Sequence, residues 1–108
     1  LVLPGDMPLI TEDLLLAWIH AHPFQAVMSL VTTHLPHATG YGRVIRKGQE
    51  VFQIVEEKDA SPQEKSIQEV AVSLYFFQPS FLSRFVAQMT CDNQQKEYYL
   101  TDSVSFAR

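Results

Sequence analysis

The segment that most restricts the fold of this chain is IQEVAVSLYFF, residues 67–77. It combines β-branched and aromatic residues and contains neither glycine nor proline, a composition that favours a β-strand. No other segment is as strand-like, so we expect residues 67–77 to form the central strand of a sheet. The segments around it then decide which neighbours that strand has.

Strand-type and helix-type segments alternate on both sides of this run. Strands are expected at residues 1–3, at 25–35 as an inner strand, and as a hairpin over 43–56 that turns at Lys47-Gly48. Helices are expected after the caps Thr11, Ser61 (with Pro62), Ser80 and Thr101, the first ending before Pro23 and the third covering 79–89. This order predicts an α/β domain whose sheet is mostly parallel and carries a β-hairpin insertion.

Composition restricts the class of protein further. A chain of 108 residues with 46% apolar and 19% charged residues is expected to form one folded domain. The net charge of -4 and the scattered Lys and Arg residues argue against a nucleic-acid partner. The apolar runs are shorter than the roughly 20 residues of a membrane span. The lone Cys91 excludes an internal disulfide and fits a reducing, cytoplasmic compartment.

An acidic residue follows the first apolar run directly. Gly5-Asp6 comes after residues 1–3 and just before the first expected helix. Two interpretations stay open on these residues alone. Asp6 is placed where open α/β sheets hold ligands, beyond the carboxyl end of a strand. Gly-Asp is also a common turn pair, and turns account for most such dipeptides.

Four histidines within eighteen residues raise the possibility of a zinc site. They are His20, His22, His34 and His37. No cysteine or carboxylate stands at ligand spacing with them, so we expect surface histidines.

Five stretches, in one order, resemble a known family: LPGDMPLIT (3–11), TGYGRVIR (39–46), QIVEEKDAS (53–61), IQEV (67–70) and KEYYLTD (96–102). Together they are similar to the uridyltransferase (pyrophosphorylase) domain of the bacterial bifunctional N-acetylglucosamine-1-phosphate uridyltransferase/glucosamine-1-phosphate acetyltransferase. The resemblance covers nearly the whole chain with the same spacings, and the combination is more specific than any one motif.

The resemblance implies a Rossmann-like nucleotidyltransferase fold and a reaction. UTP and N-acetylglucosamine 1-phosphate would give UDP-N-acetylglucosamine and pyrophosphate, a step in cell-wall and lipopolysaccharide precursor synthesis. It implies that Asp6 holds Mg²⁺ and that Gly42, Glu56, Tyr99 and Thr101 bind the sugar, Thr101 serving equally as a helix cap. Arg43 is expected to fix the loop beside Gly42 without touching a ligand.

The chain also departs from the family pattern. Ala71 stands where the family has a sugar-binding asparagine, and Ser73 stands where it has a glycine. The family's phosphate-binding loop is expected before residue 1, and its second metal ligand and acetyltransferase domain beyond residue 108. We therefore expect residues 1–108 to be the central and C-terminal part of a uridyltransferase-like domain, inactive alone, or else a non-catalytic binding or assembly module. Exposed sheet edges are expected to favour self-association.

Overall fold

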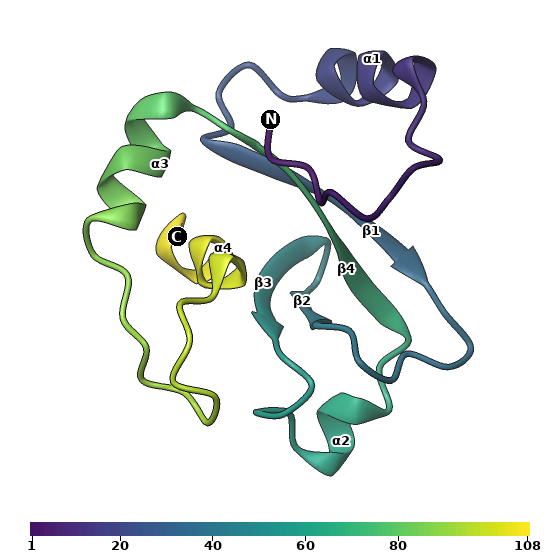
Figure 1. Cartoon of the computed structure of the whole chain (residues 1–108), viewed down its shortest axis with the longest axis vertical. Helices are drawn as coiled ribbons and strands as arrows, with labels where there is room; N and C mark the ends of the chain where they lie inside the picture. Colours follow the sequence, from purple (N-terminus) through teal and green to yellow (C-terminus); the bar gives the residue numbers. More distant parts are fainter.

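The computed structural model describes residues 1–108 as one antiparallel sheet with helices on both of its faces (Figure 1). The sheet has the strand order β1-β4-β2-β3, the strands being β1 (Met28–His34), β2 (Arg43–Lys47), β3 (Glu50–Val55) and β4 (Glu69–Phe77). The helical segments are α1 (Glu12–Ala21), α2 (Pro62–Lys65), α3 (Pro79–Val86), the 3₁₀ turn η1 (Leu100–Asp102) and α4 (Ser103–Phe106). None of these helices has the length and apolar content needed to cross a bilayer.

Strand β4 is the central strand, as the sequence predicted. It pairs with β1 on one side and with β2 on the other. The expectation that residues 25–35 form an inner strand is wrong, because β1 pairs only with β4 and lies at an edge of the sheet. One edge of β1 therefore keeps its backbone groups free of sheet partners.

The expectation of a mostly parallel sheet is wrong: all three strand pairs are antiparallel. Parallel neighbours need a long crossover, usually a helix, between the two strands. Residues 35–42 contain no helix, and residues 56–68 contain only the single turn of α2. Residues 1–3 contribute one antiparallel bridge, from Val2 to Tyr75, in place of a strand. The α/β composition is confirmed, while a Rossmann-like fold is not shown by this sheet.

The predicted hairpin forms, and it meets the rest of the sheet at one place. Strands β2 and β3 pair from Arg43–Val55 to Lys47–Glu50, and Gly48 in the turn has a φ of 62° that favours glycine. Only Arg43 pairs with β4, opposite Val70. The amide of Ala71 also donates to the carbonyl of Gly42 at 3.1 Å. This junction brings the loop before β2 against the first half of β4.

Helices cover both faces of β4 because its side chains alternate. Phe76 faces the end of α1, where the ring of His22 stacks on it at 4.1 Å. Tyr75 and Phe77 face the other way and pack with Phe81 and Phe85 of α3. A second buried cluster lies between the hairpin, β4 and α4, and it consists of Val44, Ile54, Ala71 and Val104.

Of the four expected helix caps, those at Thr11 and Ser61 are confirmed and those at Ser80 and Thr101 are wrong. The side chain of Thr11 accepts from the amide of Leu14, and Ser61 forms a capping box with Glu64. The N-cap of α3 is Gln78 and not Ser80, because Pro79 already occupies the first turn. The sequence thus predicted half of the helix caps correctly.

Candidate functional site

A carboxylate held by a buried threonine forms the centre of the candidate site. Glu56 directly follows β3, and its Oε1 accepts a hydrogen bond of 2.8 Å from Oγ1 of Thr101. Thr101 is only 8% exposed and lies inside η1. The expectation that Thr101 caps the last helix is wrong: the N-cap residue of α4 is Asp102, and the hydroxyl of Thr101 donates to Glu56.

Gly42 lies against this carboxylate and needs to be glycine for reasons of space. Its φ is not positive, whereas that of Gly40 in the same loop is 87°. A side chain at Gly42 would place its Cβ 2.8 Å from Cγ2 of Ile54 and 3.4 Å from both carboxylate oxygens of Glu56. Gly42 and Glu56 thus lie beside Thr101, although more than forty sequence positions separate them from it.

A hollow of about 290 Å³ opens beside Glu56. Its polar lining consists of one carboxylate and several hydroxyls, from Glu56, Ser73, Tyr75, Tyr98, Tyr99 and Thr101. The hydroxyl of Tyr99 accepts from Nε2 of Gln95 at 2.7 Å, and partial burial raises the pKa of Tyr99. Such a wall offers many hydrogen-bond donors and acceptors to a polyhydroxylated ligand.

Tyr75 is a lining residue that we did not predict. It is 2% exposed, and burial, together with the charge of Glu56, raises its pKa to about 12, so its phenol stays protonated. Both backbone groups of Tyr75 bond to Val2, at 2.8 and 3.0 Å, which fixes the strand beside the hollow. The sequence signal that could have indicated this role is the position of Tyr75 in β4, two residues after Ser73 and on the same face of the strand.

Ser73 shapes the wall of the hollow through an irregularity in β4. The pairing shifts between Leu30–Tyr75 and Thr32–Ala71, and Ser73 within this bulge has a φ of 60°. That conformation favours glycine, the residue that the family pattern has here. Ala71 instead belongs to the buried cluster with Val44 and Ile54, where it contributes no polar group.

Asp6 lies outside this hollow, in a neighbouring one. Gly5 and Asp6 form a turn, and the side chain of Asp6 is exposed, so the turn interpretation holds for the backbone. A hollow of about 300 Å³ is lined by Asp6, Met7, Tyr41 and Val72, and it shares Pro4 and Ser73 with the first. The structure therefore brings Gly42, Glu56, Tyr99 and Thr101 together and places Asp6 next to them.

The residues around Asp6 do not form a complete metal site. Nowhere in the chain do three side chains of His, Cys, Asp or Glu lie close enough together to hold a metal ion. Asp6 offers a single carboxylate, and the four histidines do not cluster: Nδ1 of His22 lies 2.9 Å from Oγ of Ser29. Residues of this chain alone would thus supply Mg²⁺ with one ligand, against the six that it requires.

Arg43 holds the two segments that form the site. Its guanidinium is 2% exposed; Nη1 donates to the carbonyl of Tyr41, and Nη2 lies 2.7 Å from Oε2 of Glu57. Hydrogen bonding to Arg43 lowers the pKa of Glu57. The expectation that Arg43 fixes the glycine loop is confirmed, because it links the residue before Gly42 to the residue after Glu56.

The wall behind Glu56 and Tyr99 is acidic. Asp59, Asp92 and Asp102 line a third hollow of about 240 Å³ together with Glu56 and Tyr99. Burial raises the pKa of Asp102, and the nearby charge of Asp59 adds to this effect. A phosphate group on this side would meet several negative charges, so the electrostatics favour an uncharged part of a ligand here.

Fold and site together define an α/β domain with a small hollow suited to a polar ligand. No family model matches the chain. It is 42% identical over 109 residues to "Bifunctional protein GlmU" of Syntrophotalea carbinolica, a match that covers 100% of this chain and 24% of the relative. The GlmU protein of Geotalea daltonii is 44% identical over 109 residues (99% and 24%), and that of Helicobacter pylori strain HPAG1 41% over 105 residues (97% and 23%). The chain is thus a relative of GlmU-type proteins and spans about a quarter of the length of those it matches.

Proposed function

We propose that this chain forms the sugar-binding part of an N-acetylglucosamine-1-phosphate uridyltransferase, the enzyme that makes UDP-N-acetylglucosamine and pyrophosphate from UTP and the sugar phosphate. One observation carries the proposal: the carboxylate of Glu56, held by Thr101 at 2.8 Å, lines a hydroxyl-rich hollow beside Gly42. The similarity to GlmU proteins over the whole chain supports it.

In this proposal each residue has a role that its contacts permit. Glu56 accepts hydrogen bonds from sugar hydroxyls through the oxygen that Thr101 leaves free, and Thr101 keeps the carboxylate oriented. Gly42 leaves room for the carboxylate of Glu56, because a Cβ there would lie 3.4 Å from both of its oxygens, and Tyr99 forms a wall of the hollow. The acidic wall behind Glu56 disfavours phosphate there, so the phosphates would lie toward Asp6.

Mg²⁺ enters the proposal only through Asp6. When bound, the ion would neutralise charge on the phosphates, and the nucleotide would have to supply ligands that the chain lacks. The sugar contacts at Glu56 do not depend on it.

Isothermal titration of UDP-N-acetylglucosamine, with and without MgCl₂, tests both the sugar contact at Glu56 and the Mg²⁺ contact at Asp6. We expect Glu56→Gln to weaken binding at least about tenfold, since a charged acceptor is replaced by a neutral one. Asp6→Ala should remove the dependence on Mg²⁺ and leave metal-free binding unchanged. Glu97→Gln, an exposed acid of the same loop region as Tyr99, is the matched control. Absence of binding, or equal binding by Glu56→Gln, would contradict the proposal.

A second candidate function is a non-catalytic binding module. The burial of Ala71 beside Val44 and Ile54 favours it, because the family's polar sugar contact is missing there. Such a module would bind UDP-N-acetylglucosamine without forming it. Release of pyrophosphate from UTP and the sugar phosphate, measured on a protein in which this chain is joined to the family's phosphate-binding loop, separates the two functions.

A further inference from the structure

A serine with an unfavourable backbone conformation lies in the middle of the central strand. Ser73 and Lys96 are the two residues other than glycine that have a positive φ, and the φ of Ser73 is 60°. Lys96 belongs to a loop, whereas Ser73 lies within β4 where the pairing with β1 shifts. This conformation costs free energy in a residue that has a Cβ, and residues that keep it concentrate at functional sites. Ser73 is therefore a candidate for a role that glycine could not fill.

The position of Ser73 gives its hydroxyl access to both hollows of the candidate site. Ser73 lines the hollow beside Glu56 and also the hollow beside Asp6, and the one other residue that does so is Pro4. Proline has no hydrogen-bond donor, so Ser73 supplies the only side-chain donor that borders both hollows. Ser73 is exposed, and its hydroxyl forms no hydrogen bond within the chain. The hydroxyl can therefore bind a ligand without breaking a contact of the fold.

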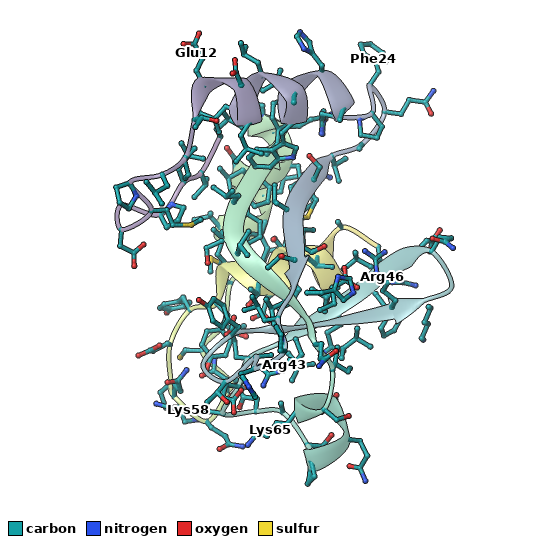
Figure 2. All side chains as sticks on the ribbon, turned by 90° about the vertical axis from the view of Figure 1, so that its right-hand side faces the viewer. Glu12, Phe24, Arg43, Arg46, Lys58 and Lys65 are labelled. Carbon is teal, nitrogen blue, oxygen red and sulfur yellow. The ribbon has the colours of Figure 1, made fainter.

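A phosphate group in these two hollows would meet no positively charged side chain. None of the Lys and Arg residues of the chain lines either hollow. Figure 2 shows four of them at the hairpin, at α2 and at the loop between them: Arg43, Arg46, Lys58 and Lys65. Side-chain contacts of this chain to a phosphate at the candidate site must therefore come from neutral donors, and a serine hydroxyl is such a donor.

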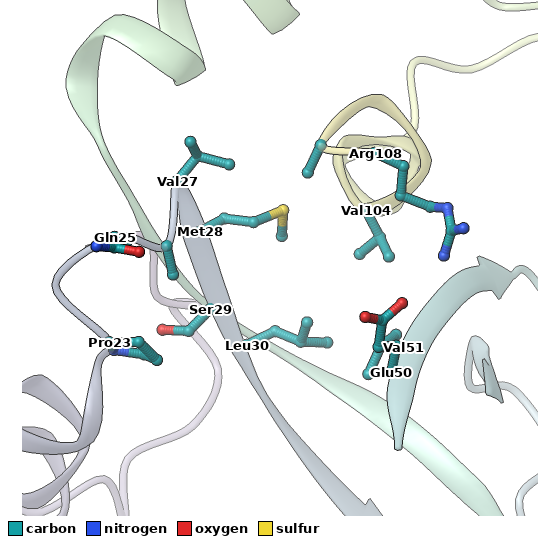
Figure 3. Close-up of a pocket in the computed structure, with 12 residues that line it drawn as sticks. Pro23, Gln25, Val27, Met28, Ser29, Leu30, Glu50, Val51, Val104 and Arg108 are labelled. Carbon is teal, nitrogen blue, oxygen red and sulfur yellow. The ribbon is translucent and has the colours of Figure 1, made fainter. Parts of the chain in front are cut away.

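The basic residue that does line a hollow is far from the candidate site. Of the four larger hollows, only the largest, of about 900 Å³, has a Lys or Arg in its wall. That residue is Arg108, which lies on the same side of the hollow as Glu50 (Figure 3). This hollow shares no lining residue with those of Glu56 and Asp6. Arg108 therefore cannot take the place of a neutral donor beside Glu56.

We propose that Ser73 is a specificity-determining residue that recognises the phosphate of a sugar 1-phosphate. Its Oγ donates a hydrogen bond to a phosphate oxygen while Glu56 accepts from hydroxyls of the same sugar. The inference rests on the proposed function, in which the sugar lies at Glu56 and its phosphate toward Asp6, because Ser73 lies on the wall that the two hollows share. A hydrogen bond to a charged oxygen is stronger than one to a neutral oxygen, so Ser73 favours phosphorylated sugars over neutral ones.

Amide chemical-shift titrations by NMR, with MgCl₂ present, test the inference on the full chain. The three probes are UDP-N-acetylglucosamine, N-acetylglucosamine 1-phosphate and unphosphorylated N-acetylglucosamine. We expect Ser73→Ala to raise the Kd of the two phosphorylated probes at least about tenfold and to leave the Kd of the neutral sugar unchanged. Ser80→Ala is the matched control, because Ser80 is an exposed serine of α3 that lines neither hollow.

A second variant, Ser73→Gly, separates ligand binding from stability. Glycine adopts a positive φ without strain, so this variant should melt at the temperature of the original chain or above it. It should nevertheless bind the two phosphorylated probes as weakly as Ser73→Ala does. A serine with only a structural role would not produce weaker binding in a protein that is at least as stable.

The outcomes distinguish a failure of this inference from a failure of the proposed function. Binding of UDP-N-acetylglucosamine that depends on Glu56 but is unchanged in Ser73→Ala would overturn the role of Ser73 and leave the proposed function standing. Equal weakening for the neutral sugar would place the Ser73 hydroxyl on the sugar instead of the phosphate, which also overturns the inference. Absence of binding by all three probes would contradict both.

Discussion

At the scale of single residues, the candidate site depends on space as much as on polar groups. Gly42 has an ordinary φ, yet a Cβ there would overlap Cγ2 of Ile54 at 2.8 Å and reach the oxygens of Glu56. Ile54 is 3% exposed and belongs to the buried cluster, so it has little freedom to move away.

We therefore predict that Gly42→Ala lowers the free energy of unfolding by about 1–3 kcal/mol, the usual cost of overpacking a core. Gly5→Ala is the control, because no atom lies within 4 Å of the added carbon and its φ is not positive. Urea unfolding of the two variants measures the difference. Equal stability of both would contradict the steric reason given for Gly42.

The sequence predicted some of these residues well and missed others for a physical reason. Gly42, Glu56, Tyr99 and Thr101 were found through motifs, and they do lie together. Tyr75 was missed because one aromatic residue in a strand-like run has no local sign that separates a core ring from a site hydroxyl. Its role follows from the bulge at Ser73 and from Val2, which are contacts between distant parts of the chain.

At the scale of elements, one buried carboxylate connects three strands. Glu69 of β4 accepts from Thr32 of β1 at 2.8 Å and from Nε and Nη2 of Arg46 of β2, each at 2.7 Å. Only one residue pair joins β2 directly to β4. The two hydrogen bonds from Arg46 to Glu69 therefore supply much of the connection between the hairpin and the central strand.

This connection should make stability depend on pH. The hydrogen bonds from Arg46 lower the pKa of Glu69 below its ordinary value of 4.5. A lowered pKa in the folded state contributes stability above the unfolded pKa, and that contribution is lost as the pH falls through the folded pKa.

We predict that Glu69→Gln lowers the free energy of unfolding by about 2 kcal/mol at neutral pH, and that the difference from the original chain shrinks toward about pH 3. Denaturant unfolding across this pH range measures it. Glu97→Gln, which removes an exposed acid with no ion pair, should show no such pattern. A difference that stays constant with pH would exclude ionised Glu69 as the cause.

The helices, strands and turns that depend on local contacts were predictable from the sequence. The direction in which neighbouring strands pair was not predictable. The hairpin, the capping box at Ser61 and the central position of β4 follow from turn residues, a cap and composition. The antiparallel order depends on which strands meet across the chain, and a mostly parallel sheet was expected because strand and helix segments alternate. The four residues of α2 are too few to form the crossover that two parallel neighbouring strands need.

At the scale of the whole molecule, the candidate site lies where three separately packed parts meet. Glu56 follows the hairpin, Ser73 and Tyr75 belong to β4, and Thr101 belongs to η1 beside α4. The hairpin meets β4 through one residue pair, whereas β1 and β4 pair along most of their length. We expect the hairpin to open more readily than the β1–β4 ladder, since fewer contacts must be broken.

A ligand bound to all three parts should oppose this opening. We predict that UDP-N-acetylglucosamine at about 100 times its Kd stabilises the chain by about 2.7 kcal/mol, and that amide exchange slows more in β2 and β3 than in β1. Hydrogen-exchange mass spectrometry with and without ligand measures this. In Glu56→Gln a tenfold higher Kd would leave the same ligand concentration at about 10 times Kd, so the stabilisation should fall to about 1.4 kcal/mol and the slowing in β2 and β3 should weaken accordingly. Slowing that is equal in β1 and β2, or that is undiminished in Glu56→Gln, would mean that the ligand does not bridge the hairpin and β4.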